Sequence, residues 1–275
     1  MNATMDDFQL LQGTTVLLVA HPDDEVLAFG ALLQQMKKAI VVFATDGAPR
    51  DDYFWKEYGS REAYAQIRRQ EAQEALSLVG AHPVFLWERV PGGITDQELF
   101  QHLPAAIRAF EQVIVEYKPT CLLTLAYEGG HPDHDAACFI AWEAGRRIGL
   151  PVWESPLYHR DADGFSAAQT FPTKTGREIH LDVEGATLEK KLRMFHTYKS
   201  QRLVMDGFRP EIEQFRPIMD YDFTARPLPW KLNYELWQWK MTGEEVAAAF
   251  ASYLGASALG ASAPPGPSRN EDQIE

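Results

Sequence analysis

Two short polar segments of this 275-residue chain combine residue types that can bind a hydrolytic metal ion. Residues 20–25 read AHPDDE, and residues 129–134 read GGHPDH. Hydrolytic zinc sites use three nitrogen or oxygen ligands from the protein and leave one position for water. The ion lowers the pKa of that water towards about 7 and polarises a substrate carbonyl group. The two segments therefore predict a metal site that activates water.

Three side chains of these segments form the predicted ligand set. His21 and Asp24 lie three residues apart across a proline turn and can converge on one ion, and His134 can complete the set. Asp23 stands beside the ligand Asp24 and is placed to accept the proton of the bound water. Metal binding is therefore predicted for His21, Asp24 and His134, and the role of general base for Asp23.

An amide nitrogen is a poor leaving group, so its hydrolysis also needs a group that stabilises the oxyanion or delivers a proton. His131 lies one helical turn before His134 and can do this. Asp133 is predicted to hold the ring of His131, because imidazoles near metal ions are commonly oriented by carboxylates. Both residues are predicted to be catalytic.

Two other kinds of site use similar residues. A single His-Pro-Asp at a strand end is usually a turn with a capping aspartate. Two such segments, each between a strand and a helix and together carrying three imidazoles, are much harder to explain as caps. Non-haem Fe(II) oxygenases also use two histidines and a carboxylate. That ligand set usually lies on a barrel of antiparallel strands, which the pattern of this chain does not favour.

Buried strands separated by helices position both segments. Short apolar runs predict strands at 14–20, 40–45, 84–87, 121–126 and 151–156. Helical periodicity predicts helices at 25–38, 60–79 and 96–117, and a further helix from Pro132 onward. Asp96 is the predicted N-cap of the third helix. This alternation implies right-handed βαβ units and an α/β fold, with a mostly parallel sheet and helices on both faces. Ligands of such sheets bind at the carboxyl ends of the strands, where both polar segments would meet.

The pattern is weaker after about residue 160. A strand is predicted at 178–183 and helices at 188–198 and 244–254, and the aromatic-rich stretch 208–239 is interpreted as a cap on the sheet. We therefore expect a single domain over residues 1–255, with a core at about 14–160 and a capping region at about 161–255. Residues 256–275 are rich in Ala, Ser, Pro and charge, and are expected to be disordered.

Composition excludes several classes of partner. The formal net charge of −13 and the sequence pI of about 5.1 disfavour general binding to nucleic acid or anionic membranes. No stretch approaches the roughly 20 apolar residues of a membrane span, and the N-terminus lacks the features of a signal peptide. Cys121 and Cys138 make no disulfide framework and are expected in the core. We expect a cytoplasmic chain that acts on a small molecule, and a homo-oligomer remains open.

The two segments together resemble the PIG-L/LmbE-like family of zinc-dependent de-N-acetylases. The resemblance covers about the first 160 residues and extends to residues 45–47, which read TDG, and to Arg68, Glu71 and Gly80. It implies a LmbE-like, Rossmann-like fold without a nucleotide, and no Gly-x-Gly-x-x-Gly follows the first strand. One departure is Tyr198, which stands where many members have a histidine.

The resemblance assigns the same roles as the chemistry. It implies that His21, Asp24 and His134 bind Zn²⁺, with Fe²⁺ as the alternative, that Asp23 is the base, and that His131 stabilises the oxyanion or acts as an acid. Family members deacetylate N-acetylglucosamine units in lipid-linked, thiol-cofactor, antibiotic and chitooligosaccharide substrates. The resemblance thus predicts removal of an N-acetyl or other N-acyl group from an amino-sugar or glycoconjugate substrate.

Three other functions fit parts of the same pattern. One is an amidase acting on a thiol–sugar conjugate, which some family members are. Another is a metallophosphoesterase, which would need a further bridging carboxylate and basic phosphate clamps, for which Arg50 and Arg68 are the candidates. The third is a binding module without activity, which would be expected to have lost Asp23 or His131.

Four residues near the motifs are predicted to bind substrate. Arg68 can reach sugar hydroxyls or can pair with a glutamate of its own helix, and Asp46 follows the second strand. Tyr127 and Glu128 lie beside His131 and can line the pocket.

Overall fold

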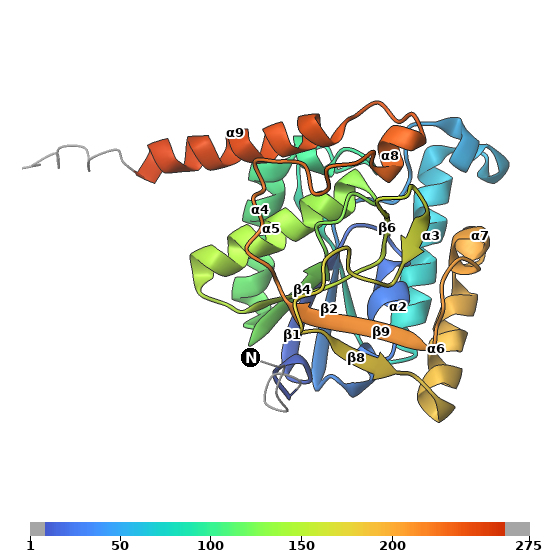
Figure 1. Ribbon diagram of the computed structural model, residues 1–275. Coiled ribbons are helices and arrows are strands. Elements are labelled where there is room, and N and C mark those ends of the chain that lie inside the picture. Colours follow the sequence, from blue (N-terminus) through green and yellow to red (C-terminus); the bar gives the residue numbers. More distant parts are fainter. Residues whose placement is uncertain (1–8, 262–275) are drawn as a thin grey trace, which may run out of the picture.

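A seven-stranded sheet forms the centre of the computed structural model, which describes residues 9–261. The strand order is β3-β2-β1-β4-β5-β9-β8 (Figure 1). The first five of these strands are parallel, and β9 and β8 continue the sheet in antiparallel pairing. The strands are β1 (Thr14–Val19), β2 (Lys38–Phe43), β3 (His82–Phe85), β4 (Cys121–Leu125), β5 (Val152–Ser155), β8 (Ile179–Asp182) and β9 (Ile212–Pro217). The predicted α/β fold with a mostly parallel sheet is confirmed.

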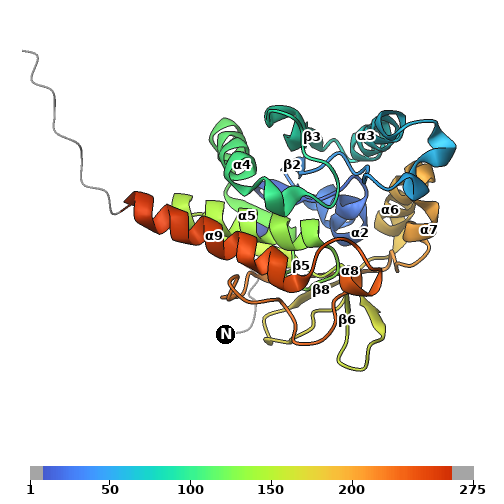
Figure 2. The same cartoon turned by 90° about the horizontal axis from the view of Figure 1, so that it is seen from above.

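Helices cover both faces of the sheet, as Figure 2 shows. One face carries α4 (Leu103–Tyr117), α5 (Pro132–Ile148) and α9 (Gly243–Ala261), and the other carries α2 (Asp24–Phe29), α3 (Arg61–Ser77) and α6 (Gly185–Thr197). Successive residues of β1 enter different cores: Val16 and Leu18 pack under the first helices, and Leu17 and Val19 under the second. A strand buried on both faces has to be apolar throughout, which explains the apolar run at this strand.

The strand order reverses beside β1, and this reversal places the two polar segments together. β1 pairs with β2 on one side and with β4 on the other, with Leu18 opposite Thr124. The chain leaves β1 and β4 at the same edge of the sheet, and the crevice at such a switch point is the usual ligand site of an open α/β sheet. The predicted meeting of the segments at this edge is confirmed.

The helix predicted at 25–38 is much shorter in the structure. α2 ends at Phe29, one turn of 3₁₀ helix follows at Leu32–Gln35, and β2 already begins at Lys38. The carboxylate of Glu213 on β9 accepts hydrogen bonds from the N–H groups of Ala31 and Leu32, at 2.6 and 3.0 Å. This distant carboxylate takes the amides that would continue the helix.

The helix predicted at 96–117 begins only at Leu103, so Asp96 is not its cap. Gln97 has a left-handed backbone, with φ of 73°, and a short 3₁₀ turn follows at Leu99–Gln101. The Asp133 carboxylate accepts hydrogen bonds from the N–H groups of Gln97 and Leu99, at 2.6 and 2.9 Å. A contact with a residue more than 30 positions away thus holds this segment outside a helix.

The predicted capping region shares the sheet of the core, because β9 pairs with β5. It also contributes α7 (Arg202–Met205), α8 (Asn233–Leu236) and a hairpin of β6 (Tyr158–Arg160) with β7 (Ser166–Ala168). α9 extends to Ala261 and so includes residues 256–261 of the segment that was expected to be disordered, and residues 262–275 lie outside the described part. Within residues 9–261, no helix has the length and apolar character that crossing a membrane requires.

Candidate active site

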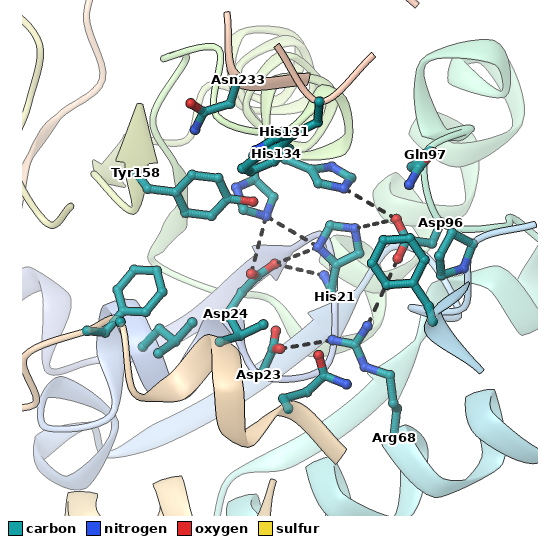
Figure 3. A pocket seen from close by; sticks show the side chains of 18 of the residues that line it. His21, Asp23, Asp24, Arg68, Asp96, Gln97, His131, His134, Tyr158 and Asn233 are labelled. Carbon is teal, nitrogen blue, oxygen red and sulfur yellow. Dashed lines mark hydrogen bonds and ion pairs between the residues drawn. The ribbon is translucent and has the colours of Figure 1, made fainter. Parts of the chain in front are cut away.

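His21, Asp24 and His134 bring donor atoms together at the carboxyl ends of β1 and β4 (Figure 3). His21 Nδ1 lies 3.4 Å from Asp24 Oδ2, and His134 Nε2 lies 3.2 Å from Asp24 Oδ1 and 3.3 Å from His21 Nδ1. Two ligands held about 2.0–2.1 Å from a tetrahedral zinc ion lie about 3.3–3.4 Å apart. The two Asp24 contacts run to different carboxylate oxygens, and the three side chains, which form a donor triangle, together offer the donor types and the short separations that one zinc ion requires.

The orientation of the His21 ring supports this ligand set. Its other nitrogen, Nε2, lies 3.2 Å from Asp96 Oδ1 and 3.3 Å from Asp133 Oδ2. Metal-binding histidines usually give their second N–H to a carboxylate, which fixes the ring. His21, Asp96, His131 and Asp133 also lie close enough to hold an ion. There, however, both oxygens of Asp133 accept backbone N–H groups, whereas in Asp24 only Oδ2 does, from His21 at 2.8 Å, so the set of His21, Asp24 and His134 fits a metal better.

Asp23 has a strained backbone beside the donor triangle. Its φ of 125° is one that a side chain-bearing residue rarely adopts, and such strain gathers at functional sites. The Glu25 carboxylate accepts a hydrogen bond from the Asp23 N–H at 3.0 Å and helps to hold this conformation. Burial raises the pKa of Asp23 to about 7, against the opposing effect of the Arg68 cation. A carboxylate that titrates near neutrality is suited to act as a base.

Arg68 lies in the wall of the pocket, and its guanidinium group is engaged by the protein. It donates to Asp23 Oδ2 at 2.9 Å and to the backbone carbonyls of Pro22 and Gly47 at 2.6 and 2.5 Å. A Cβ atom at Gly47 would lie 2.9 Å from Arg68 Nη1, so this close packing requires glycine. Arg68 was predicted to bind substrate, and in the structure it orients Asp23.

His131 is the N-cap of α5, and its hydrogen bonds define its tautomer. Its Nδ1 accepts the N–H of Asp133 at 3.1 Å, so a neutral ring carries its proton on Nε2, which lies 3.4 Å from Asp96 Oδ1. Burial, assisted by the nearby His21, lowers the pKa of His131 to about 4. At neutral pH the ring is therefore a hydrogen-bond donor without net charge.

The prediction that Asp133 holds the ring of His131 is wrong. The buried carboxylate of Asp133 binds the backbone of residues 97–99 and lies beside His21 Nε2, and only its backbone N–H meets His131. Asp133 is also outside the cavity lining. Its carboxylate holds in place the loop that carries Asp96.

Asp96 is a site residue that the sequence interpretation missed. It is buried between His21 and His131, with Oδ1 3.2 and 3.4 Å from their Nε2 atoms. Burial opposes its ionisation, but these two histidines outweigh that effect and lower the pKa of Asp96 well below its ordinary value. An aspartate before a helical pattern is also the usual N-cap signal, so nothing local distinguished the two roles.

Tyr127 and Glu128 do not line the pocket, contrary to prediction. The Tyr127 hydroxyl donates to the carbonyl of Ala225 at 2.8 Å, in an aromatic core. The buried Glu128 carboxylate accepts hydrogen bonds from the N–H groups of Leu157 and Tyr158 at 2.6 and 2.9 Å. A buried loop has to satisfy its backbone N–H groups, and Glu128 does this for the chain beside it.

Asp46 binds the loops that surround the site. Its Oδ2 lies 2.5 Å from Arg61 Nη1, and its Oδ1 accepts the N–H groups of Ala48 and Asp96 at 3.0 and 3.3 Å. It does not line the cavity. Asp46 was predicted to bind substrate, and in the structure its carboxylate holds the loops around Arg68 and Asp96.

A cavity of about 390 Å³ opens over the metal donors and Asp23. Its walls include aromatic side chains that the sequence interpretation did not assign to the site: Phe54, Tyr158, Phe208, Trp237 and Trp239. The Tyr158 ring centroid lies 5.3 Å from that of His134, and the Trp239 centroid lies 4.9 Å from that of His131. Phe208, Trp237 and Trp239 belong to the aromatic-rich stretch that was interpreted as a cap, and Phe54 and Tyr158 come from two other segments, so no single sequence pattern placed all five at the site.

A known family model matches the part of the chain that runs from β1 into α5. Residues 16–145 match the family model described as PIG-L: GlcNAc-PI de-N-acetylase. This part of the chain is a PIG-L domain. The match contains both polar segments, and the predicted family is confirmed. No curated protein matched the sequence.

Solved structures share the fold of this chain. A deacetylase of teicoplanin biosynthesis is 20% identical, with a TM-score of 0.58 over 74% of this chain and 97% of that one. The A40926 pseudoaglycone deacetylase is 23% identical, with a TM-score of 0.59 over 76% and 98%. The 4-carboxy-2-hydroxymuconate hydratase of Pseudomonas putida KT2440 is 17% identical, with a TM-score of 0.52 over 76% and 96%. At these identities the likeness establishes the fold alone.

Proposed function

We propose that this PIG-L protein is a metal-dependent hydrolase that removes an N-acetyl or other N-acyl group from an amino-sugar substrate. The observation that carries the proposal is the triangle of His21, Asp24 and His134 donors with the ionisable Asp23 beside it. The fold does not choose the reaction, because proteins of similar structure include deacetylases and a hydratase. The description of the family model supports an N-acetyl amino sugar as the substrate.

A divalent ion held by His21, Asp24 and His134 would polarise the amide carbonyl and make water a better nucleophile. Asp23 accepts the proton that this water loses as its oxygen bonds to the carbonyl carbon. Arg68 holds Asp23 in place and favours its ionised form, through the contact of 2.9 Å. Zinc suits two imidazoles and a carboxylate, and ferrous iron is the alternative ion.

His131 and Asp23 complete the reaction. The Nε2–H of His131 donates a hydrogen bond to the carbonyl oxygen as negative charge develops on it. His131 cannot also supply a proton near neutral pH, because its pKa is about 4. Asp23 is therefore the acid that returns its proton to the leaving nitrogen. The C–N bond then breaks to give an acid and a free amine.

The structure favours this proposal over a phosphoesterase. The two predicted phosphate clamps are occupied, since Arg68 binds Asp23 and Arg50 Nε lies 2.5 Å from Glu98 Oε1. Arg68 is the one arginine that lines the cavity in the described part of the chain. Hydrolysis of a thiol–sugar conjugate would use the same chemistry on a different acyl group.

Acetate release tests the proposal. The purified protein, loaded with Zn²⁺, is incubated with N-acetylglucosamine and its glycosides, and acetate and free amine are both measured. We expect equal amounts of the two products, loss of activity with a chelator, and recovery when Zn²⁺ is added back. The matched variants are His134→Ala and His180→Ala, the latter an exposed histidine on β8. A metal-loaded protein that releases phosphate from p-nitrophenyl phosphate, but no acetate from any N-acetyl amino sugar, would contradict the proposal.

A further inference from the structure

Asn233 is a buried side chain at the cavity to which the proposed reaction gives no role. It is the first residue of α8, it lines the cavity, and it is only 1% exposed. Its backbone N–H donates to the carbonyl of Gly129 at 3.1 Å, on the loop that leads to His131. Asn233 therefore joins the capping region to one of the two polar segments at the wall of the site.

Arg160 determines which end of the Asn233 amide faces the cavity. Arg160 Nε donates to Asn233 Oδ1 at 2.8 Å, and Arg160 Nη1 donates to the carbonyl of Gly164 at 2.9 Å. A guanidinium group carries only donors, so the amide atom that meets it has to be the oxygen. The NH₂ group of Asn233 is therefore the end that remains for another partner.

This NH₂ group has no hydrogen-bond partner within residues 9–261, although Asn233 Nδ2 is buried. Burial of an amide N–H without an acceptor costs free energy, and a ligand that supplies the acceptor recovers it. In Figure 3, Asn233 and Asp23 lie on opposite sides of the donor triangle. A ligand that lies over the triangle thus has Asp23 at one end and the donor of Asn233 at the other.

The proposed reaction limits which group of the ligand Asn233 can meet. An NH₂ group needs an acceptor, so neither a cation nor a hydrocarbon suits it. The carbonyl oxygen of the substrate amide is already bound by the ion and by His131. The acceptors that an amino sugar still offers are its hydroxyl oxygens.

From these observations we propose that Asn233 binds the substrate, by donating a hydrogen bond from Nδ2 to a hydroxyl group of the amino sugar. This inference rests on the proposed function. The contact holds the sugar ring at the end of the cavity away from Asp23, so that the N-acyl group lies over the donor triangle. Arg160 is a positioning residue, because it acts on the substrate only through the Asn233 amide.

Binding of deoxy sugars tests the contact. N-acetylglucosamine and its 3-, 4- and 6-deoxy analogues are titrated into the Zn²⁺-loaded Asp23→Asn variant, which turns over slowly. Tryptophan fluorescence reports binding, because Trp237 and Trp239 line the cavity. We expect one deoxy analogue to bind roughly 5- to 100-fold more weakly than the parent sugar, the loss that follows when a buried donor is left without its acceptor. Addition of Asn233→Ala should bring that ratio close to one.

Two further variants separate the donor from the structural contact with Arg160. Arg160→Met is the matched control, because it removes the same contact but leaves the NH₂ group, and it should keep most of the deoxy penalty. Asn233→Asp keeps the contact with Arg160 but offers only acceptors at neutral pH. Fluorine cannot donate a hydrogen bond, so Asn233→Asp should reject the corresponding deoxyfluoro sugar more strongly than the parent does. This variant decides the question if Asn233→Ala does not fold.

Kinetics give a second measurement. A contact made equally before and during the reaction affects KM rather than kcat. Asn233→Ala in the otherwise unchanged protein should therefore raise KM for N-acetylglucosamine with little change in kcat or in zinc content. Gln66→Glu on α3, an exposed residue that does not line the cavity, should change neither constant.

The outcomes distinguish this proposal from the proposed function. Coupling between Asn233 and one hydroxyl group, without deacetylation of any sugar, would support the contact while the proposed function fails. Deacetylation of N-acetylglucosamine with deoxy penalties that Asn233→Ala leaves unchanged would refute the contact alone. Absence of binding by all of these sugars would overturn both proposals.

Discussion

Arg68 should set the pH at which the protein becomes active, because it is the cation in contact with Asp23. Arg68 Nη2 lies 2.9 Å from Asp23 Oδ2, and both side chains are buried. Opposite charges about 4 Å apart interact by about 4 kcal/mol at an effective dielectric constant of about 20, an upper bound of about 3 pKa units. Pairs of this kind typically lower the pKa of an aspartate by about 1–3 units.

Removal of the Arg68 cation should therefore change the pKa of Asp23 in a definite direction. Burial holds the pKa of Asp23 at about 7, and Arg68 opposes that rise. In Arg68→Met the opposing effect is lost and the pKa increases. Because only the ionised carboxylate accepts a proton, we expect the acidic limb of the kcat/KM profile to move to higher pH by about 1–3 units.

The assay is the pH dependence of acetate release at saturating Zn²⁺. Arg68→Lys keeps the charge and should move the limb less than Arg68→Met. Arg69→Met is the matched control, because Arg69 is the next residue of α3 and pairs with Glu88 instead. The plateau should also fall in Arg68→Met, since contacts with Pro22 and Gly47 are lost. A lower plateau with an unmoved limb would refute this reasoning and make Arg68 a scaffold only.

Three further variants test the assigned roles. His134→Ala should lower the metal content from about one ion per chain to a small fraction, by elemental analysis, whereas His180→Ala should not; full occupancy in the first would contradict the ligand set. Asp23→Asn should keep the ion and lose roughly 10²–10⁴-fold in kcat, and parent-like turnover would exclude Asp23 as the base. His131→Ala should lose roughly 10²–10³-fold in kcat, as for one oxyanion donor. It should leave the alkaline limb in place, because a ring with pKa about 4 does not titrate there; disappearance of that limb would restore the acid role of His131.

The sequence predicted those features that depend on local patterns. The apolar runs before His21 and before residues 129–134 required buried parallel strands, and the alternation with helices placed their ends at one edge. The meeting of the two polar segments could therefore be predicted without knowing the structure of the loops. The donor triangle follows from this topology and from short-range spacing.

Long-range contacts account for what was missed. Asp96 lies at the site because Asp133 binds the amides of Gln97 and Leu99 and prevents a helix there. Glu128 was assigned to the pocket because it is close to His131 in sequence, but its carboxylate is needed by the amides of residues 157 and 158. Sequence proximity to a motif does not tell whether a side chain faces the ligand or the backbone of a neighbouring loop.

The charges around the site give an argument for a cation that does not depend on family membership. Asp23, Asp24, Asp96 and Asp133 are all buried within a small volume, and Arg68 contacts only one of them closely. Burying several anions together is costly unless positive charge is supplied.

The pKa of His21 reflects the same excess of buried carboxylates over positive charge. Burial alone would lower it, but Asp96 and Asp24 outweigh burial and raise it well above its ordinary value. Without a metal, the ring would take up a proton to compensate the carboxylates. A dication at the donor triangle supplies more positive charge and displaces that proton, so metal binding and proton release are coupled here. The carboxylates that orient the ligands thus also favour the binding of a cation, because their negative charges are buried together.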